Sequence, residues 1–319
     1  ATVAQTTGSE FGSTITNLII NNNNGVALGG SKTINGALTL TAGTLATGAN
    51  TLTINGTTTG AGFINTGASG TLIYGGTAEQ TLSASNLTSG AVNNLIINAG
   101  SKLTSSGTIA ATNLTINSSD SGTGTFKDNG TLTSGTSTVQ QYLINQSWYL
   151  TSPVNDGVNT ANPVSPTNLS RIQSYIEGDG VGNTWSATGT TMVPYKGYIT
   201  TVSDNPKTVV FTGKINSGAI SIPLTRQAVS TANKYGFNLI GNPYTAYLDW
   251  KLVSAANASK MPTSTMWYRT KVSGSWDFTT VNGAGVVTPA NASRRIPPMQ
   301  GFWVRASQVG NSTLDVTDA

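Results

Sequence analysis

The stretch Leu18-Ile19-Ile20-Asn21 recurs through the first part of the chain, and this recurrence decides the fold. Its close and looser copies are Leu52-Thr53-Ile54-Asn55, Leu95-Ile96-Ile97-Asn98, Leu114-Thr115-Ile116-Asn117, Leu38-Thr39-Leu40 and Leu72-Ile73-Tyr74. They cluster at intervals of about twenty residues, which is the length of one coil in a stacked β-repeat. A strand this short cannot bury its apolar side alone, so successive coils must stack on one another. The pattern therefore predicts a solenoid.

The predicted solenoid covers residues 1–140, where short aliphatic strands alternate with Asn/Gly turns such as Asn21-Asn22-Asn23-Asn24-Gly25. A disordered low-complexity segment would not need regularly recurring aliphatic triplets. We predict a right-handed parallel β-helix, or a related solenoid, of about six or seven coils and about 30 Å in height. The Asn after each Ile is expected to form the turn and to bond the equivalent Asn one coil away.

Residues 141–319 have a different composition, because every Trp and Pro of the chain lies here. Strand-like runs such as Gly197-Tyr198-Ile199-Thr200 and Gly301-Phe302-Trp303-Val304-Arg305 are bounded by turn residues. Their spacing predicts a jelly-roll-like antiparallel β-sandwich, and so an all-β chain. One short helix is expected from Asp249 to about Ala256, capped by Asp249 and ended by Asn257.

The composition excludes several classes of function. The 319 residues include neither His nor Cys, so disulfides, thiolate metal sites and His-dependent catalysis are impossible. The net charge of +4 comes without the clustered basic stripe of a nucleic-acid-binding protein. No apolar run approaches the roughly 18 residues of a membrane span. Without His, we expect stability and assembly to change little between about pH 6 and 8.

One candidate metal site lies in a Gly-rich segment. Glu177, Asp179 and Asn183 place oxygen ligands along a short loop, and oxygen ligands suit Ca²⁺. The full calcium-loop pattern is missing, and the same residues are good turn formers. Both interpretations remain open. No other cofactor is expected.

Two carbohydrate-related interpretations also remain open. Asp249 and Asp277 sit beside Trp250 and Trp276, as the acids of a sugar-processing cleft would, although Asp249 also suits a helix cap and Trp suits a core. Aromatic residues that would form a sugar-binding platform, if exposed rather than packed in the core, are Trp185, Tyr195, Tyr198, Tyr244, Trp267 and Trp276.

Several motifs carry a resemblance to known proteins. Gly76-Thr77-Ala78-Glu79-Gln80-Thr81, followed by Asn93-Asn94-Leu95-Ile96-Ile97-Asn98, resembles a repeat of Bacteroidota surface proteins. The β-rich module that follows such repeats is similar at Trp148–Val154, Phe237–Tyr244 and Ile296–Val304. The resemblance implies a secreted or cell-surface protein of the type exported by the type IX secretion system. Such proteins carry a C-terminal sorting domain that this sequence lacks, which implies cleavage or omission of that domain. The small polar residues from Ala1 onward predict a mature form whose leader has been removed.

The sequence as a whole favours a non-enzymatic extracellular structural protein: a surface stalk or adhesin, or the subunit of a self-assembling fibre or tube. Self-association is expected through terminal strands or coil ends, for which residues 1–15 and Thr313-Leu314-Asp315-Val316-Thr317 are the candidates. The alternative is that both ends complete their own domains. The remaining alternatives are a carbohydrate-binding module that contacts surface glycans, and a polysaccharide lyase or hydrolase.

Overall fold

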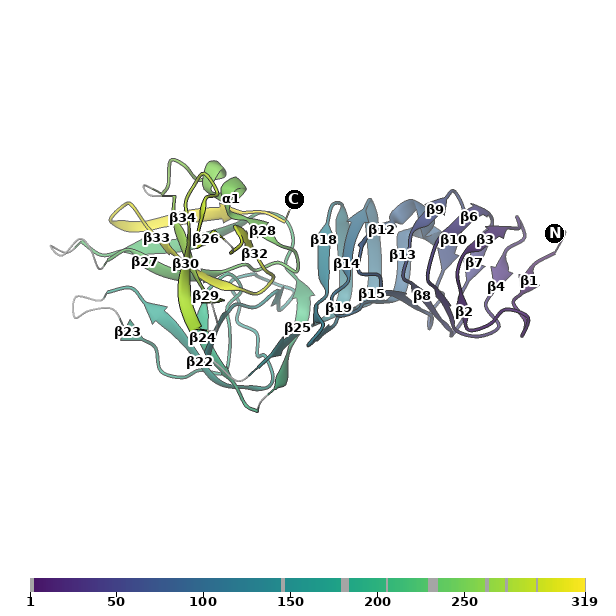
Figure 1. Cartoon of the computed structure of the whole chain (residues 1–319), viewed down its shortest axis with the longest axis horizontal. Helices are drawn as coiled ribbons and strands as arrows, with labels where there is room; N and C mark the ends of the chain where they lie inside the picture. The colour runs from purple at the N-terminus through teal and green to yellow at the C-terminus, as the bar shows by residue number, and fades with distance from the viewer. Residues whose placement is uncertain are drawn as a thin grey trace. The chain divides into compact units, whose positions relative to one another are not determined.

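The computed structural model consists of two compact units, Ala1–Tyr142 and Leu143–Asp318, which are considered separately. It describes residues 3–144, 147–178, 184–204, 206–228, 235–261, 264–272, 275–290 and 292–318. In these residues β-strands predominate, and α1 (Trp250–Ala256) is the one α-helix (Figure 1). The prediction of an all-β chain is thereby confirmed.

The first unit is a parallel β-solenoid of seven coils, as predicted. One strand of each coil contributes to a continuous face, the main sheet, in the order β2 (Thr14–Ile15), β5 (Lys32–Ile34), β8 (Thr51–Ile54), β11 (Thr71–Tyr74), β13 (Ala91–Ile97), β15 (Thr108–Ile116) and β19 (Thr131–Leu143). These strands follow one another along the unit in Figure 1.

Three shorter parallel sheets form the other faces of the coils. The first contains β3 (Leu18–Asn21), β6 (Leu38–Ala42) and β9 (Thr58–Gly60). The second contains β1 (Gln5–Thr6), β4 (Val26–Ala27), β7 (Thr44–Ala46) and β10 (Phe63–Asn65). The third contains β12 (Glu79–Ser83), β14 (Lys102–Ser106) and β18 (Thr125–Asp128).

The interior of the solenoid is built from columns of stacked apolar side chains. Leu52 pairs with Leu72 and Leu72 with Leu95, and all three are fully buried. A parallel column contains Ile34, Ile54, Tyr74, Ile97, Ile116 and Val139. Each buried aliphatic side chain contributes about 1.5–3 kcal/mol. Because each strand points only a few such side chains inward, the core forms only when the coils stack.

The structure corrects the predicted alignment of the repeats. Leu18-Ile19-Ile20 aligns with Leu38-Thr39-Leu40 on β3 and β6, whereas Leu52-Thr53-Ile54 lies on the main sheet. The coil neighbours of Leu52-Thr53-Ile54 are instead Lys32-Thr33-Ile34. Two faces of one coil therefore carry nearly the same apolar pattern. The predicted three-residue length is also wrong for later coils, where β19 extends over Thr131–Leu143.

The buried amide of Gln80 explains the Gly76–Thr81 motif. Its Nε2 donates to the carbonyl oxygens of Ile54 and Gly56 at 3.0 and 2.7 Å, and its Oε1 accepts from the Gly76 amide at 2.9 Å. Asn86 acts in the same way, with Nδ2 donating to the Gly60 and Gly62 carbonyls. These side chains bond corner carbonyls of the preceding coil, of which the Ile54 carbonyl also accepts from the Gly75 amide at 3.0 Å.

The predicted bond between Asn residues of neighbouring coils is confirmed at Asn55. Its Nδ2 donates to Asn35 Oδ1 at 2.8 Å. A second Asn pair occurs on the main sheet, where Asn113 Nδ2 donates to Asn94 Oδ1 at 2.9 Å. Such bonds fix the position of one coil over the next.

Tyr74 is an ionisable side chain that is fully buried in the interior of the solenoid. Burial raises the pKa of Tyr74 far above its ordinary value near 10, against a smaller opposing effect of the nearby Thr58 hydroxyl. Neither the Tyr74 nor the Thr58 hydroxyl makes a hydrogen bond of normal geometry within the described residues. Because folding raises the pKa of Tyr74, the folded state favours the neutral phenol. The contribution of Tyr74 to the free energy of unfolding is therefore fully present below about pH 10 and is lost as the pH rises further.

We therefore expect the solenoid to lose stability above about pH 10, and Tyr74→Phe to remove much of this loss. At neutral pH the variant is expected to change stability by less than about 1 kcal/mol, because no hydrogen bond is lost. Far-UV circular dichroism during urea unfolding at pH 7 and pH 11 measures both effects. An alkaline loss of the same size in Tyr74→Phe would contradict the assignment.

The second unit contains antiparallel strand pairs throughout its described residues. One sheet has the order β20 (Ser147–Leu150), β24 (Tyr198–Val202), β22 (Leu169–Ile176), β23 (Thr184–Trp185). Another has the order β27 (Phe237–Gly241), β33 (Gly301–Arg305), β29 (Met266–Val272), β30 (Ser275–Val281), β31 (Val287–Thr288). Three further pairs join β21 (Val154–Asn155) to β25 (Lys207–Ile215), β26 (Ile220–Arg226) to β34 (Gly310–Val316), and β28 (Leu248–Asp249) to β32 (Arg295–Ile296).

The predicted helix is confirmed together with both of its end residues. Asp249 caps α1, its side chain accepting from the Lys251 amide at 3.0 Å, and Asn257 follows as the C-terminal cap. Trp250 lies at the first turn and is fully buried, with its ring edge-to-face against Phe302 at 5.9 Å between centroids. The helix therefore contributes directly to the apolar core of the unit.

The C-terminal strand β34 is occupied on both sides. One edge pairs with β26 over Gly310–Val316. On the other edge, the buried Asn257 side chain accepts from the Asp315 amide and donates to the Asp315 carbonyl, each at 2.8 Å. Tyr244 Oη donates to the Gly218 carbonyl at 2.6 Å and lies 3.1 Å from the Val316 carbonyl. This arrangement corresponds to the alternative in which the C-terminal strand completes its own domain.

Candidate functional site

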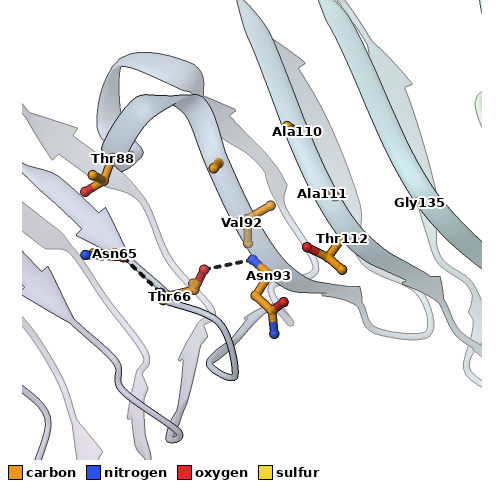
Figure 2. A pocket seen from close by; sticks show the side chains of 11 residues that line it. Asn65, Thr66, Thr88, Val92, Asn93, Ala110, Ala111, Thr112 and Gly135 are labelled. Carbon is orange, nitrogen blue, oxygen red and sulfur yellow. Dashed lines mark hydrogen bonds between the residues drawn. The ribbon is translucent and has the colours of Figure 1, made fainter.

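One open groove on the solenoid has a volume of about 420 Å³ (Figure 2). It crosses several coils, from the turn after β10 to the strands β13, β15 and β19. Its lining residues are Asn65, Thr66, Gly67, Thr88, Ala91, Val92, Asn93, Ala110, Ala111, Thr112 and Gly135.

The groove is hollow because small residues lie level with one another on adjacent strands. Ala91 pairs with Ala110, and Val92 with Ala111. At Gly135 even one added carbon is excluded, since a Cβ would lie 2.6 Å from the Thr112 carbonyl oxygen. The close approach of the two backbones therefore requires glycine at this point.

Hydrogen bonds within the solenoid fix the wall of the groove. Thr66 Oγ1 accepts from the Asn93 amide at 2.8 Å, which ties the turn to β13 (Figure 2). Asn65 Oδ1 accepts from the Gly67 amide at 2.9 Å and stabilises the turn itself. The polar groups of the lining are amides and hydroxyls, and no lining side chain is ionisable. The groove is therefore suited to a neutral ligand, and its lining offers no general acid or base.

Of the three predicted calcium ligands, the structure places Glu177, while Asp179 and Asn183 lie outside the described residues. Glu177 is 8% exposed and directly follows β22. Its carboxylate accepts from the Gln227 amide at 3.0 Å and from the Gly236 amide at 2.6 Å. Glu177 thus has a structural role, because its hydrogen bonds connect the end of β22 to the segment after β26 and to the segment before β27.

Two of the six residues of the predicted aromatic platform are buried. Tyr244 and Tyr198 are buried, Trp185, Tyr195 and Trp267 are partly exposed, and the Trp276 side chain lies outside the described residues. Trp185 belongs to a cluster of rings that the sequence analysis missed, with Tyr149, Tyr175 and Trp303.

This cluster is held together by ring packing. Trp303 meets Tyr175 edge-to-face with centroids 4.7 Å apart, and Trp185 lies nearly parallel to Tyr149 at 6.4 Å. Trp303 Nε1 is buried without a hydrogen-bond partner in the described residues. The four residues lie on β20, β22, β23 and β33. The cluster could therefore be predicted only by knowing which of these strands lie next to one another.

The predicted carboxylates have local partners. Asp249 caps α1 and also accepts from Arg294 Nε at 3.0 Å, while its neighbour Trp250 is buried and cannot line a cleft. Asp277 is exposed on β30, and its Oδ1 accepts from the Phe278 amide. No group of three or more acidic side chains suited to a metal occurs within the described ranges. Nor is any helix in them long and apolar enough to cross a membrane.

Comparison with known proteins gives one match. Residues 56–317 match a family described as "Domain of unknown function (DUF8693)". The match begins within the solenoid and continues through the second unit, so it covers elements of both. No curated protein and no solved structure matches the chain.

Proposed function

We propose that this chain, which belongs to the DUF8693 family, is a non-enzymatic structural protein of the cell surface or extracellular space. In this proposal the solenoid is a stalk, adhesin element or assembly unit, and the second unit is a globular module attached to it. The observation that carries the proposal is the seven-coil stack, whose buried amides at Gln80 and Asn86 bond backbone groups of neighbouring coils. A solenoid of this kind extends by repetition and presents long surfaces.

The secreted or surface location, and export by the type IX system, belong to the same proposal. They are supported by the resemblance of the Gly76–Thr81 motif and by the scarcity of charge, with 9% charged residues. Low charge combined with abundant Thr, Ser and Asn suits exposed β-surface.

The second unit is proposed to be a jelly-roll-like sandwich. Its core cluster contains Ile222 and Leu314 from the β26–β34 pair, Phe302 from the five-stranded sheet, and Trp250 from α1. Apolar side chains from separate sheets thus meet in one core, as they do between the layers of a sandwich.

Self-association is proposed through the first coil. Strands β1, β2 and β3 end their respective sheets and are paired along one edge each within the described residues. Ile19 on β3 is an apolar side chain with 67% of its surface exposed. Edge strands of this kind accept further strands unless charge or covering groups protect them. By contrast, β34 is covered by Asn257 and Tyr244.

Electron microscopy of the purified chain at rising concentration tests this proposal. We expect regular filaments or tubes, and we expect Ile19→Lys to abolish them because it places a charge on the edge strand. Thr39→Lys is the matched control, since Thr39 pairs with Ile19 but lies on the central strand β6. Dispersed particles at every concentration would contradict self-assembly and leave the stalk or adhesin alternative.

The neutral groove favours a second candidate function, carbohydrate binding. Its amide and hydroxyl lining suits an uncharged oligosaccharide. Titration calorimetry with neutral oligosaccharides is expected to show binding that Ala110→Arg abolishes and that Ala49→Arg, at an exposed position outside the groove, leaves unchanged. Equal binding by both variants would exclude the groove as the site.

A further inference from the structure

The outer face of the main sheet carries a straight column of β-branched side chains. One residue of each coil contributes, and each pairs with the next in constant register: Thr14, Thr33, Thr53, Ile73, Ile96, Thr115 and Thr138. No register shift occurs between any of these strands, in contrast to the β3–β6 pair. All seven side chains are partly or fully exposed.

A second column runs parallel to the first, two residues earlier on each strand. It consists of Thr51, Thr71, Asn94, Asn113 and Thr136. Strand geometry sets the spacing at about 4.8 Å between coils and about 6.6–6.8 Å between the columns. The face is therefore a two-dimensional grid of hydroxyl, amide and methyl groups.

The grid is fixed in place and carries no charge. Asn113 Nδ2 donates to Asn94 Oδ1 at 2.9 Å, and Asn94 Nδ2 lies 3.4 Å from Thr71 Oγ1. Directly behind the grid, the buried Leu and Ile columns hold the strands. None of the twelve residues of the two columns is an acid or a base. A rigid periodic surface of this kind loses little conformational freedom on binding.

Size and chemistry decide what fits this face. A second copy of the same face would bury roughly 400 Å² per partner, or about 800 Å² in total, below the roughly 1,200 Å² of a stable interface. Anionic polymers would need cationic side chains, and the columns contain none. The columns also contain no aromatic residue on which a sugar ring would stack. A neutral ligand with its own two-dimensional hydroxyl lattice remains.

We propose that this face binds ice. Water molecules at an ice surface form a neutral, periodic hydrogen-bonding lattice, and the grid presents uncharged groups at the regular spacings of coils and columns. Thr methyl groups, together with the side chains of Ile73 and Ile96, order the adjacent water, and the Thr hydroxyls join its hydrogen-bond network. The grid shares Thr14 on β2 with the first coil, but its other eleven residues lie on later coils and none of them lines the groove. Ice binding therefore does not depend on self-association.

Ice recrystallisation and ice-crystal shape in the presence of the purified chain test the proposal. The wild-type chain is expected to suppress recrystallisation at micromolar concentration and to produce faceted crystals. The double variant Thr53→Lys/Thr115→Lys, which places two charges on the grid, is expected to need at least a tenfold higher concentration. Circular dichroism and thermal unfolding show whether the variant keeps the fold.

The matched control is the double variant Thr39→Lys/Thr59→Lys. Thr39 on β6 and Thr59 on β9 are also outward-facing residues of the solenoid, but they lie outside the grid. It is expected to retain wild-type activity. Absence of any effect of the folded wild-type chain on ice would overturn the proposal. So would an equal loss in the grid and control variants.

Discussion

Replacing Gln80 by Ala is expected to lower the free energy of unfolding of the solenoid by about 3 kcal/mol or more. The Gly76 amide and the Gly56 carbonyl would lose the amide that bonds them in a buried corner, and the Ile54 carbonyl would keep only its bond from the Gly75 amide. Each unsatisfied buried group costs about 1–3 kcal/mol, and the cavity adds to the loss. Urea unfolding followed by far-UV circular dichroism measures the effect.

The matched control for this prediction is Thr77→Ala, an exposed position of the same motif. It is expected to change stability by no more than about 0.5 kcal/mol. A loss below about 1 kcal/mol for Gln80→Ala would show that water replaces the amide. The motif would then have no structural explanation in Gln80.

Glu177→Ala is expected to destabilise the second unit by about 2–4 kcal/mol. The Gln227 and Gly236 amides would lose a buried charged acceptor, and hydrogen bonds to charged groups are the stronger ones. Glu177→Gln keeps one carbonyl acceptor and should lose about half as much. Tryptophan fluorescence during urea unfolding reports this unit selectively, because all six Trp residues lie in it.

The same experiment distinguishes the structural role of Glu177 from the predicted calcium site. With a structural role alone, added Ca²⁺ and chelator leave the wild-type unfolding curve unchanged, and the exposed Asp277→Ala behaves like the wild type. A calcium-dependent stabilisation that disappears in Glu177→Gln would restore the metal interpretation.

The sequence predicted those features of the fold that depend on residues close together along the chain. The helix ends at Asp249 and Asn257 follow from capping chemistry, and the coil number follows from the spacing of the aliphatic triplets. The alignment of Leu18-Ile19-Ile20 with Leu52-Thr53-Ile54 was wrong because two faces of a coil have the same alternation of apolar side chains. Only the register, in which Leu18 pairs with Leu38, separates the two faces.

The candidate sites could not be predicted from the sequence, because they depend on contacts between residues that lie far apart along the chain. The groove lining extends from Asn65 to Gly135 and consists of small, neutral residues without a motif. Glu177 stood out as an acid in a Gly-rich segment, but its partners lie 50 and 59 residues away. Likewise, the Thr column becomes visible only when the coil register is known, because its members are separated by irregular intervals.

The most direct test of the proposed function is immunogold labelling of intact cells that produce the protein, with antibodies raised against the solenoid. We predict gold particles on the outer surface or on extracellular material, with no increase in label when the cells are permeabilised. Labelling that appears only after permeabilisation would contradict a role as an extracellular structural protein.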